Sequence, residues 1–344
     1  DESELEIHKE EQENSTQISA SNFGLAALSG MINTTDEILT GRLYGDFTLH
    51  GDGTFAGNGR IEKLTVAQAD LGLFKWEADK ANESFNIDVS SSGESLDFTA
   101  KGSLTPQSDS ASTMNLQFNL TRFDIAALPK IVPSLIYAGS GTLSGEIDIN
   151  GSTSAPQLNG SLGFKSSKIG LVANGSTYSI DNQNIEISPE KIAFNKFSIA
   201  DSAGQQLVVN GNITHKNFDK MRSDLSIKAD NFEIANLKAE ANQGYYGKLL
   251  ADLDIDISGR LDAPKIKADI DIDEKTELTY VVPESEYSDS FDDNLIVWTE
   301  FGATKESDIL TRSKNQPTKP RDIYANTIDL NGEIDIDKDA IFKV

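Results

Sequence analysis

The stretches ADLDIDISG, residues 251–259, and IKADIDID, residues 266–273, alternate apolar and mostly acidic residues over nearly their whole length. Successive side chains of a β-strand point to opposite faces of the sheet, so each stretch places its aliphatic groups on one side and its carboxylates on the other. A period of two is typical of a strand and not of a helix. The sequence therefore predicts a sheet with one aliphatic face and one solvated, carboxylate-rich face.

The first of these stretches belongs to a phrase that recurs at long period. Residues 143–151, LSGEIDING, match residues 251–259, and an earlier copy lies at residues 43–51. An Ala-Pro pair follows the second and third copies, and no linker-like break occurs until about Pro283. Repeats of roughly a hundred residues that join without linkers indicate one continuous, quasi-one-dimensional sheet.

We therefore predict an all-β fold, an elongated, curled and repetitive sheet that resembles a taco or solenoid and leaves a groove, with very few short helices. At about ten residues per strand the chain would hold roughly 30 strands. In chain order we expect a polar linker or frayed edge over 1–20, a continuous β-repeat groove over 21–282 with the phrases near 41–51, 141–164 and 247–272, a short strand (295–298) among flexible acidic and polar insertions over 283–326, and the truncated start of a further β segment over 327–344. One or two helical turns are expected within each of the segments 23–32 and 124–128.

Composition excludes several classes of function. The 344 residues contain 30 Lys and Arg against 55 Asp and Glu, a formal net charge of −25, which repels nucleic acid. The chain has no cysteine, so disulfides and thiolate metal sites are absent. No run approaches the ~20 apolar residues of a transmembrane helix, and no signal-peptide pattern opens the chain, so we expect any membrane anchor to lie outside this fragment.

Catalytic and metal sites have little support in the sequence. An EF-hand loop starting at Asp269 would need Gly where Glu274 stands and Glu where Tyr280 stands. Carboxylates are so abundant that their spacing favours a solvated face over acid–base chemistry. The three histidines are scattered, at His8, His50 and His215. We therefore predict no enzyme, no catalytic residue, no metal and no cofactor.

An aliphatic sheet face must be covered by another layer or by something that the chain does not encode. Burying methylenes there gains roughly 0.8 kcal/mol each, so a lipid acyl chain would bind without a specific polar site. The predicted groove lining comprises Leu143, Ile147, Ile149, Leu162, Phe164, Leu225, Ile227, Leu253, Ile255, Ile257, Ile266, Ile270 and Ile272.

Two other interpretations remain open. A closed β-solenoid adhesin or binding scaffold would pack both walls of its core against each other and carry no lipid. A glycan-cleaving β-helix enzyme would add carboxylates and aromatic residues at one cleft, and the hints of sugar stacking are limited to Trp76, Tyr245 and Tyr246.

Three consecutive segments resemble the repeats of the TamB and wider AsmA-like family, a short helix followed by glycine-punctuated strands: ALPKIVPSL at 127–135, GTLSGEIDING at 141–151 and APQLNGSLGF at 155–164. Two further segments resemble the approach to the C-terminal TamB domain in a long form such as Bacteroidota carry: ELTYVVPE at 277–284 and IDLNGEIDIDKDA at 328–340. The resemblance covers residues 41–344.

This resemblance implies a taco-shaped sheet in the periplasm, as part of a protein anchored in the inner membrane. It implies phospholipid acyl chains and an outer-membrane barrel of the Omp85 class as partners. The expected function is to carry phospholipid toward the outer membrane, to support outer-membrane protein assembly, or both.

Overall fold

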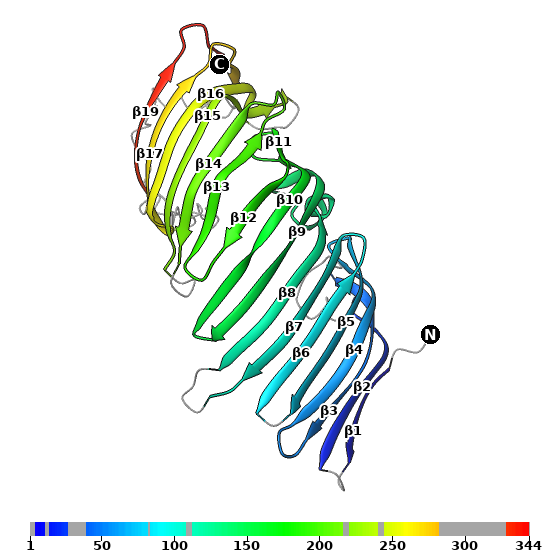
Figure 1. The fold of residues 1–344 in the computed structure, drawn as a ribbon. Coiled ribbons are helices and arrows are strands. Elements are labelled where there is room, and N and C mark those ends of the chain that lie inside the picture. The colour runs from blue at the N-terminus through cyan, green and yellow to red at the C-terminus, as the bar shows by residue number, and fades with distance from the viewer. Residues whose placement is uncertain are drawn as a thin grey trace, which may run out of the picture.

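The structure, a computed structural model, describes residues 4–10, 14–26, 39–81, 83–107, 112–215, 220–239, 244–281 and 328–343. These residues form a single sheet of 20 strands with one short helical segment. Figure 1 shows the sheet as an elongated, twisted ribbon that runs from β1 at one end to β19 at the other. The predicted elongated all-β fold is confirmed.

The strands are long, and their bounds are β1 Glu4–Glu10, β2 Ser15–Gly24, β3 Leu39–His50, β4 Phe55–Val66, β5 Ala69–Ala81, β6 Ser84–Ser92, β7 Leu96–Thr105, β8 Thr113–Asp124, β9 Ile136–Ser152, β10 Ala155–Leu171, β11 Thr177–Ile180, β12 Gln183–Ile187, β13 Lys191–Ala200, β14 Gln206–Thr214, β15 Arg222–Leu237, β16 Tyr245–Arg260, β17 Ala263–Ile272, β18 Glu277–Tyr280, β19 Asp329–Ile336 and β20 Ile341–Lys343. The described residues form fewer strands than a length of about ten residues per strand predicts, because strands such as β9 and β10 reach 17 residues each.

The topology is a meander in which strands that follow one another in sequence pair antiparallel. The meander has two exceptions. In the middle of the sheet, β11 and β12 both pair with β10. At the C-terminal end, β19 pairs parallel with β17, and β20 pairs parallel with β18. The turns alternate between two long borders of the ribbon. We call the border with the turns at 50–54, 152–155 and 260–263 the lower rim, and the opposite border the upper rim (Figure 1).

The repeat phrases occupy equivalent places in the sheet. Gly151 and Gly259 end two copies with φ of 94° and 92°, and each pairs with the proline at the second position of the next strand, Pro156 or Pro264. Positive φ favours glycine, which explains why the phrase ends on that residue. The sequence repeat is thus a repeat of hairpin geometry.

The ends of the chain differ from the expected layout. Where a linker or frayed edge was expected over residues 1–20, β1 and most of β2 form the first hairpin, because Leu5, Ile7 and Ile18 alternate with polar residues. The segment 283–326, with its expected strand at 295–298, lies outside the described residues. In the C-terminal segment 327–344, β19 and β20 continue the same sheet.

One kind of β-bulge, in which the bulged strand advances by three residues while its neighbour advances by two, recurs in six of the described strands. The register shifts lie between Ala20 and Phe23, Ile61 and Leu64, Leu120 and Phe123, Lys165 and Lys168, Phe194 and Phe197, and Ala229 and Phe232. In five of them a residue adopts a left-handed backbone, with φ between 48° and 52°, namely Asn22, Lys63, Ser166, Lys196 and Asn231. A bulge bends its strand and increases the twist, so this line of bulges creases the ribbon below its upper rim.

Side chains of neighbouring strands or turns accept hydrogen bonds from the backbone at three of these bulges. The N–H of Ser166 donates to Asp181 (2.8 Å), that of Lys196 to Asn210 (2.9 Å) and that of Asn231 to Asp252 (2.6 Å). An unpaired backbone N–H is costly when it is shielded from water, so these polar side chains help to hold the crease.

One short helical segment lies against the sheet, close to where the sequence predicted a helical turn. Asp124 caps the 3₁₀ helix η2, Ile125–Ala127, which continues into the α-helix α2, Leu128–Ile131. The carbonyl of Ile125 lies so close to β9 that a Cβ at Gly139 would come within 2.3 Å of it. The second expected turn falls partly in β2, and residues 27–32 lie outside the described residues.

The upper rim of the C-terminal half closes into a small core. Phe232 and Leu237 are 3% and 5% exposed, and the Tyr178 ring stacks on Phe232 with centroids 5.4 Å apart and planes 6° apart. The turn after β10 reaches β15, where the Asn236 N–H donates to the Asn174 carbonyl (2.8 Å).

Candidate hydrophobic groove

All thirteen predicted lining residues lie on one face of the sheet, which we call the apolar face. They form rows across the strands because apolar residues face apolar residues or glycines in the register. Leu225 pairs with Ile257 and Ile257 with Ile266, and the same holds for Leu143 with Phe164, Ile227 with Ile255, and Leu253 with Ile270. Ile147, Ile149, Leu162 and Ile272 continue these rows.

Each of these thirteen side chains is half-buried, whereas the acidic residues between them on β16 and β17, such as Asp254 and Asp269, are exposed. In the described part of the chain, the strong contacts join strands that are neighbours in the sheet, and apart from η2–α2 no element packs across the apolar face. Among the described residues the face is therefore an open apolar surface, and none of them forms the second wall that a closed solenoid would have. Its role as a lipid-binding lining stays a prediction.

The aromatic part of this face, in the N-terminal half, is not among the predicted lining residues. Phe55 contacts Phe47 (ring centroids 5.4 Å apart) and Phe85 (5.7 Å), and Phe98 contacts Phe118 (5.4 Å) and Phe74 (6.5 Å). The signal was present, since residues 85–89 and 98–104 alternate with a period of two, but the prediction followed the clearer copies of the repeat phrase.

Trp76 lies flat on the apolar face above two glycines. In the register Gly45 pairs with Gly59 and Gly59 with Trp76. A Cβ on Gly59 would lie 2.8 Å from the indole Cε2, and one on Gly45 would lie 3.4 Å from Cζ2. The glycines therefore make room for the indole.

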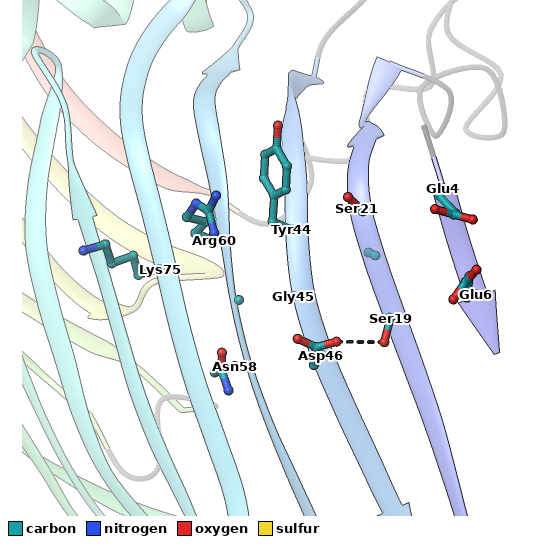
Figure 2. A pocket seen from close by; sticks show the side chains of 12 residues that line it. Glu4, Glu6, Ser19, Ser21, Tyr44, Gly45, Asp46, Asn58, Arg60 and Lys75 are labelled. Atoms are coloured by element: carbon teal, nitrogen blue, oxygen red, sulfur yellow. Dashed lines mark hydrogen bonds between the residues drawn. The ribbon is translucent and has the colours of Figure 1, made fainter. Parts of the chain in front are cut away.

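The opposite face, which we call the polar face, carries three bounded hollows of about 430, 530 and 780 Å³ over β1–β7, and Lys75 borders all three. Figure 2 shows the first, where the Ser19 hydroxyl donates to Asp46 (2.7 Å). Arg60 lies over the Tyr44 ring, 4.5 Å from its centroid, and pairs with Glu62 (2.8 Å). Polar and charged residues predominate among the residues that line these hollows.

Carboxylates face each other on the polar face of the C-terminal half. Asp254 pairs with Asp269 in the register, an arrangement that is unfavourable for like charges. Lys228 offsets it at 2.7 Å from Asp254, and its hydrogen bond to that carboxylate raises the lysine pKa. Among the residues that the structure describes, no cluster of histidine and carboxylate groups could hold a metal ion.

A family comparison identifies this architecture. Residues 86–193 and 195–343 match the TamB C-terminal domain. The chain belongs to the TamB family. The TamB match spans β6 to β20, and so contains every predicted lining residue.

Proteins of the TamB family are non-enzymatic components of the cell envelope that are anchored in the inner membrane, cross the periplasm, and serve lipid transport or protein assembly. No curated protein and no solved structure matches this TamB chain. Over the residues described here, none of its helices is long and apolar enough to cross a membrane.

Proposed function

We propose that this TamB-family chain carries phospholipid acyl chains across the periplasm toward the outer membrane, as part of an inner-membrane-anchored protein. The observation that supports this most directly is the open apolar face, which continues across the ribbon from β2 to β17 with half-buried aliphatic and aromatic side chains. Each methylene of a lipid that leaves water on this face gains roughly 0.8 kcal/mol. The rows repeat from strand to strand, so one position of the chain offers much the same surface as the next.

The test is native mass spectrometry with lipid extraction on the chain purified from bacterial membranes in mild detergent. The test variant changes Ile147, Ile255 and Ile270 to Asp and so adds three charges to the apolar face. The matched control adds three charges to the exposed polar side of the same region, through Ser144→Asp, Asn150→Asp and Ser258→Asp.

We expect phospholipid with the wild type and with the control, and its loss in the folded test variant. A wild-type chain that carries no lipid yet melts as a well-packed protein would contradict the proposal and favour an adhesive scaffold.

A second candidate function, assembly of outer-membrane proteins with an Omp85-class barrel, is favoured by the C-terminal edge of the sheet. Of the described strands β19 pairs with β17 alone, which leaves its other edge open, and its Leu330 and Ile334 are 67% and 63% exposed. An exposed strand edge can pair with an incoming strand.

This function is tested in cells by photo-crosslinking from residues on β19, with residues on β6 as the control. Barrel protein crosslinked from β19 alone would support it, and equal or absent crosslinks from both strands would count against it.

A further inference from the structure

Charged side chains are almost excluded from the apolar face below the line of bulges. In the register of the described strands, two charged residues lie on that face, Lys9 on β1 and Lys80 on β5. Both are cations, both are in the row nearest the lower rim, and the chain as a whole carries 55 acidic residues against 30 basic ones. Apolar strand faces rarely admit a charge without a partner, so these positions need an explanation.

Lys80 sits within an aromatic cluster. In the register it lies between Phe55 and Phe85, whose ring centroids come within 5.7 Å of each other across β5. Its Nζ lies over the Phe85 ring, 5.2 Å from the centroid. The aliphatic stem thus packs with the rings while the ammonium group is held at the border of the apolar face.

This ammonium group has no counter-ion among the residues that the structure describes. Within the described part of the chain, no carboxylate forms an ion pair with Lys80, whereas Lys101 on the polar face pairs with Asp88 at 2.7 Å. The C-terminal half shows no equivalent, because its lowest row on the apolar face holds Ile213, Ser223, Gly259 and Pro264. A cation fixed beside an apolar surface is suited to a ligand with an anionic head and a hydrocarbon body.

We propose that Lys80 binds the phosphate of a lipid whose acyl chains lie on the aromatic part of the apolar face. This inference rests on the proposed lipid-carrying function and deepens it, because it assigns the headgroup chemistry and the orientation. The phosphate lies at the lower rim beside Lys80 and Phe85, and the acyl chains extend toward the crease over Phe74 and Phe98. Lys9, which is exposed in the same row, adds positive charge along this border.

The test compares Lys80→Met with Lys75→Met in the full 344-residue chain. Lys75 is on the same strand and faces the polar side, and it too forms no ion pair within the described residues, so both variants remove one unpaired positive charge. Lys80→Arg retains the charge. Each protein is titrated with phosphatidylglycerol and with diacylglycerol of the same acyl chains, and bound lipid is quantified by native mass spectrometry.

We expect the wild type, Lys75→Met and Lys80→Arg to prefer the phosphate-bearing lipid by about tenfold, and Lys80→Met to lose that preference while still binding diacylglycerol. Equal binding of both lipids by the wild type, or an unchanged preference in Lys80→Met, would overturn the headgroup assignment and leave the groove proposal standing. Failure of both lipids to bind would reject both proposals.

Inorganic phosphate distinguishes a lipid headgroup from a free anion. We expect millimolar phosphate to compete weakly, because it gains nothing from the apolar face. Competition by phosphate that matches the lipid in affinity would overturn the lipid assignment.

Discussion

The two halves of the ribbon share one pattern of rows but are stabilised differently. In the N-terminal half, β3–β8, aromatic rings contact one another on the open apolar face. In the C-terminal half, over β14–β17, the open face is aliphatic, and the most deeply buried residues lie instead in the closed upper rim. The repeat therefore specifies the strands and their faces, whereas stability depends on what each copy adds at its rim.

The largest expected effect concerns Glu233 in the closed rim. Its side chain is 2% exposed and accepts hydrogen bonds from Ser176 and Ser202, both at 3.0 Å, and it pairs with Lys248 at 3.3 Å. Glu233→Ala leaves these groups without their acceptor, and we expect a loss of about 3 kcal/mol in the free energy of unfolding. Hydrogen exchange of the β11 and β15 amides checks it.

The control for this prediction is Glu77→Ala on the exposed polar face of the N-terminal half, which we expect to change stability by no more than about 0.5 kcal/mol. If both variants cost the same, the rim would not be the stabilising region.

The next effect concerns the packing of the Trp76 indole over Gly59 and Gly45. Gly59→Ala would place a Cβ 2.7 Å from the Tyr44 carbonyl and 2.8 Å from the indole, and we expect this overpacking to cost about 2 kcal/mol. In a protein that also carries Trp298→Phe, the fluorescence of Trp76 should shift to longer wavelength as the indole moves away from Gly59. Gly163→Ala in β10 is the control, since its Cβ would meet the movable Asn184 side chain at 2.7 Å. An unshifted emission spectrum in Gly59→Ala would contradict the packing of the indole against Gly59.

A smaller effect is expected from Tyr178→Phe, at about 1 kcal/mol, because the hydroxyl contacts the carbonyls of Glu233 (3.1 Å) and Ile234 (3.0 Å). Burial raises the pKa of the Tyr178 phenol, with the nearby carboxylates of Glu233 and Asp201 adding to the rise. The folded state therefore favours the neutral phenol.

The stability from that neutral phenol is complete below about pH 10, the pKa of an exposed tyrosine, and is lost as the pH rises through the higher folded value. Thermal melts between pH 8 and 11 should show a shallower alkaline decline for Tyr178→Phe than for the wild type. Identical alkaline slopes for the wild type and Tyr178→Phe would contradict this account.

The smallest effect is expected on the polar face of the C-terminal half. Lys228→Met removes an ion pair to Asp254 in which both side chains are more than half exposed. Water and salt screen such pairs, so we expect no measurable change in melting temperature at physiological ionic strength. A clear drop in the melting temperature would mean that this lysine stabilises the facing carboxylates.

Much of the fold could be predicted from residue alternation. Leu253, Ile255 and Ile257 define one face of a strand, and the recurrence of that phrase near Leu143 predicted the equivalent hairpin. The strand lengths were underestimated because the glycines that punctuate the sequence, such as Gly145 and Gly160, lie within strands and leave room for the neighbouring backbone.

The candidate site was predicted only in part, for physical reasons. The bulges at Lys63 and Lys196 depend on the neighbouring strand, and a lysine gives no local signal of a left-handed backbone. Glu233 reads as one more surface carboxylate until the turns around Asp201 and Asn174 fold over it. Lys80 is spaced from Phe74 and Trp76 by an even number of residues, so the sequence places it on the same face. Its position in the aromatic cluster, however, depends on Phe55 and Phe85 from two other strands.

The meander has a consequence for how such a protein sets its reach. Each hairpin pairs mainly with the strands immediately before and after it, so inserting or deleting one hairpin changes the ribbon by roughly 10 Å while its cross-section stays the same. The number of hairpins therefore sets the length of the ribbon. Gene duplication could match its length to the distance between two membranes without redesigning the surface that runs along it.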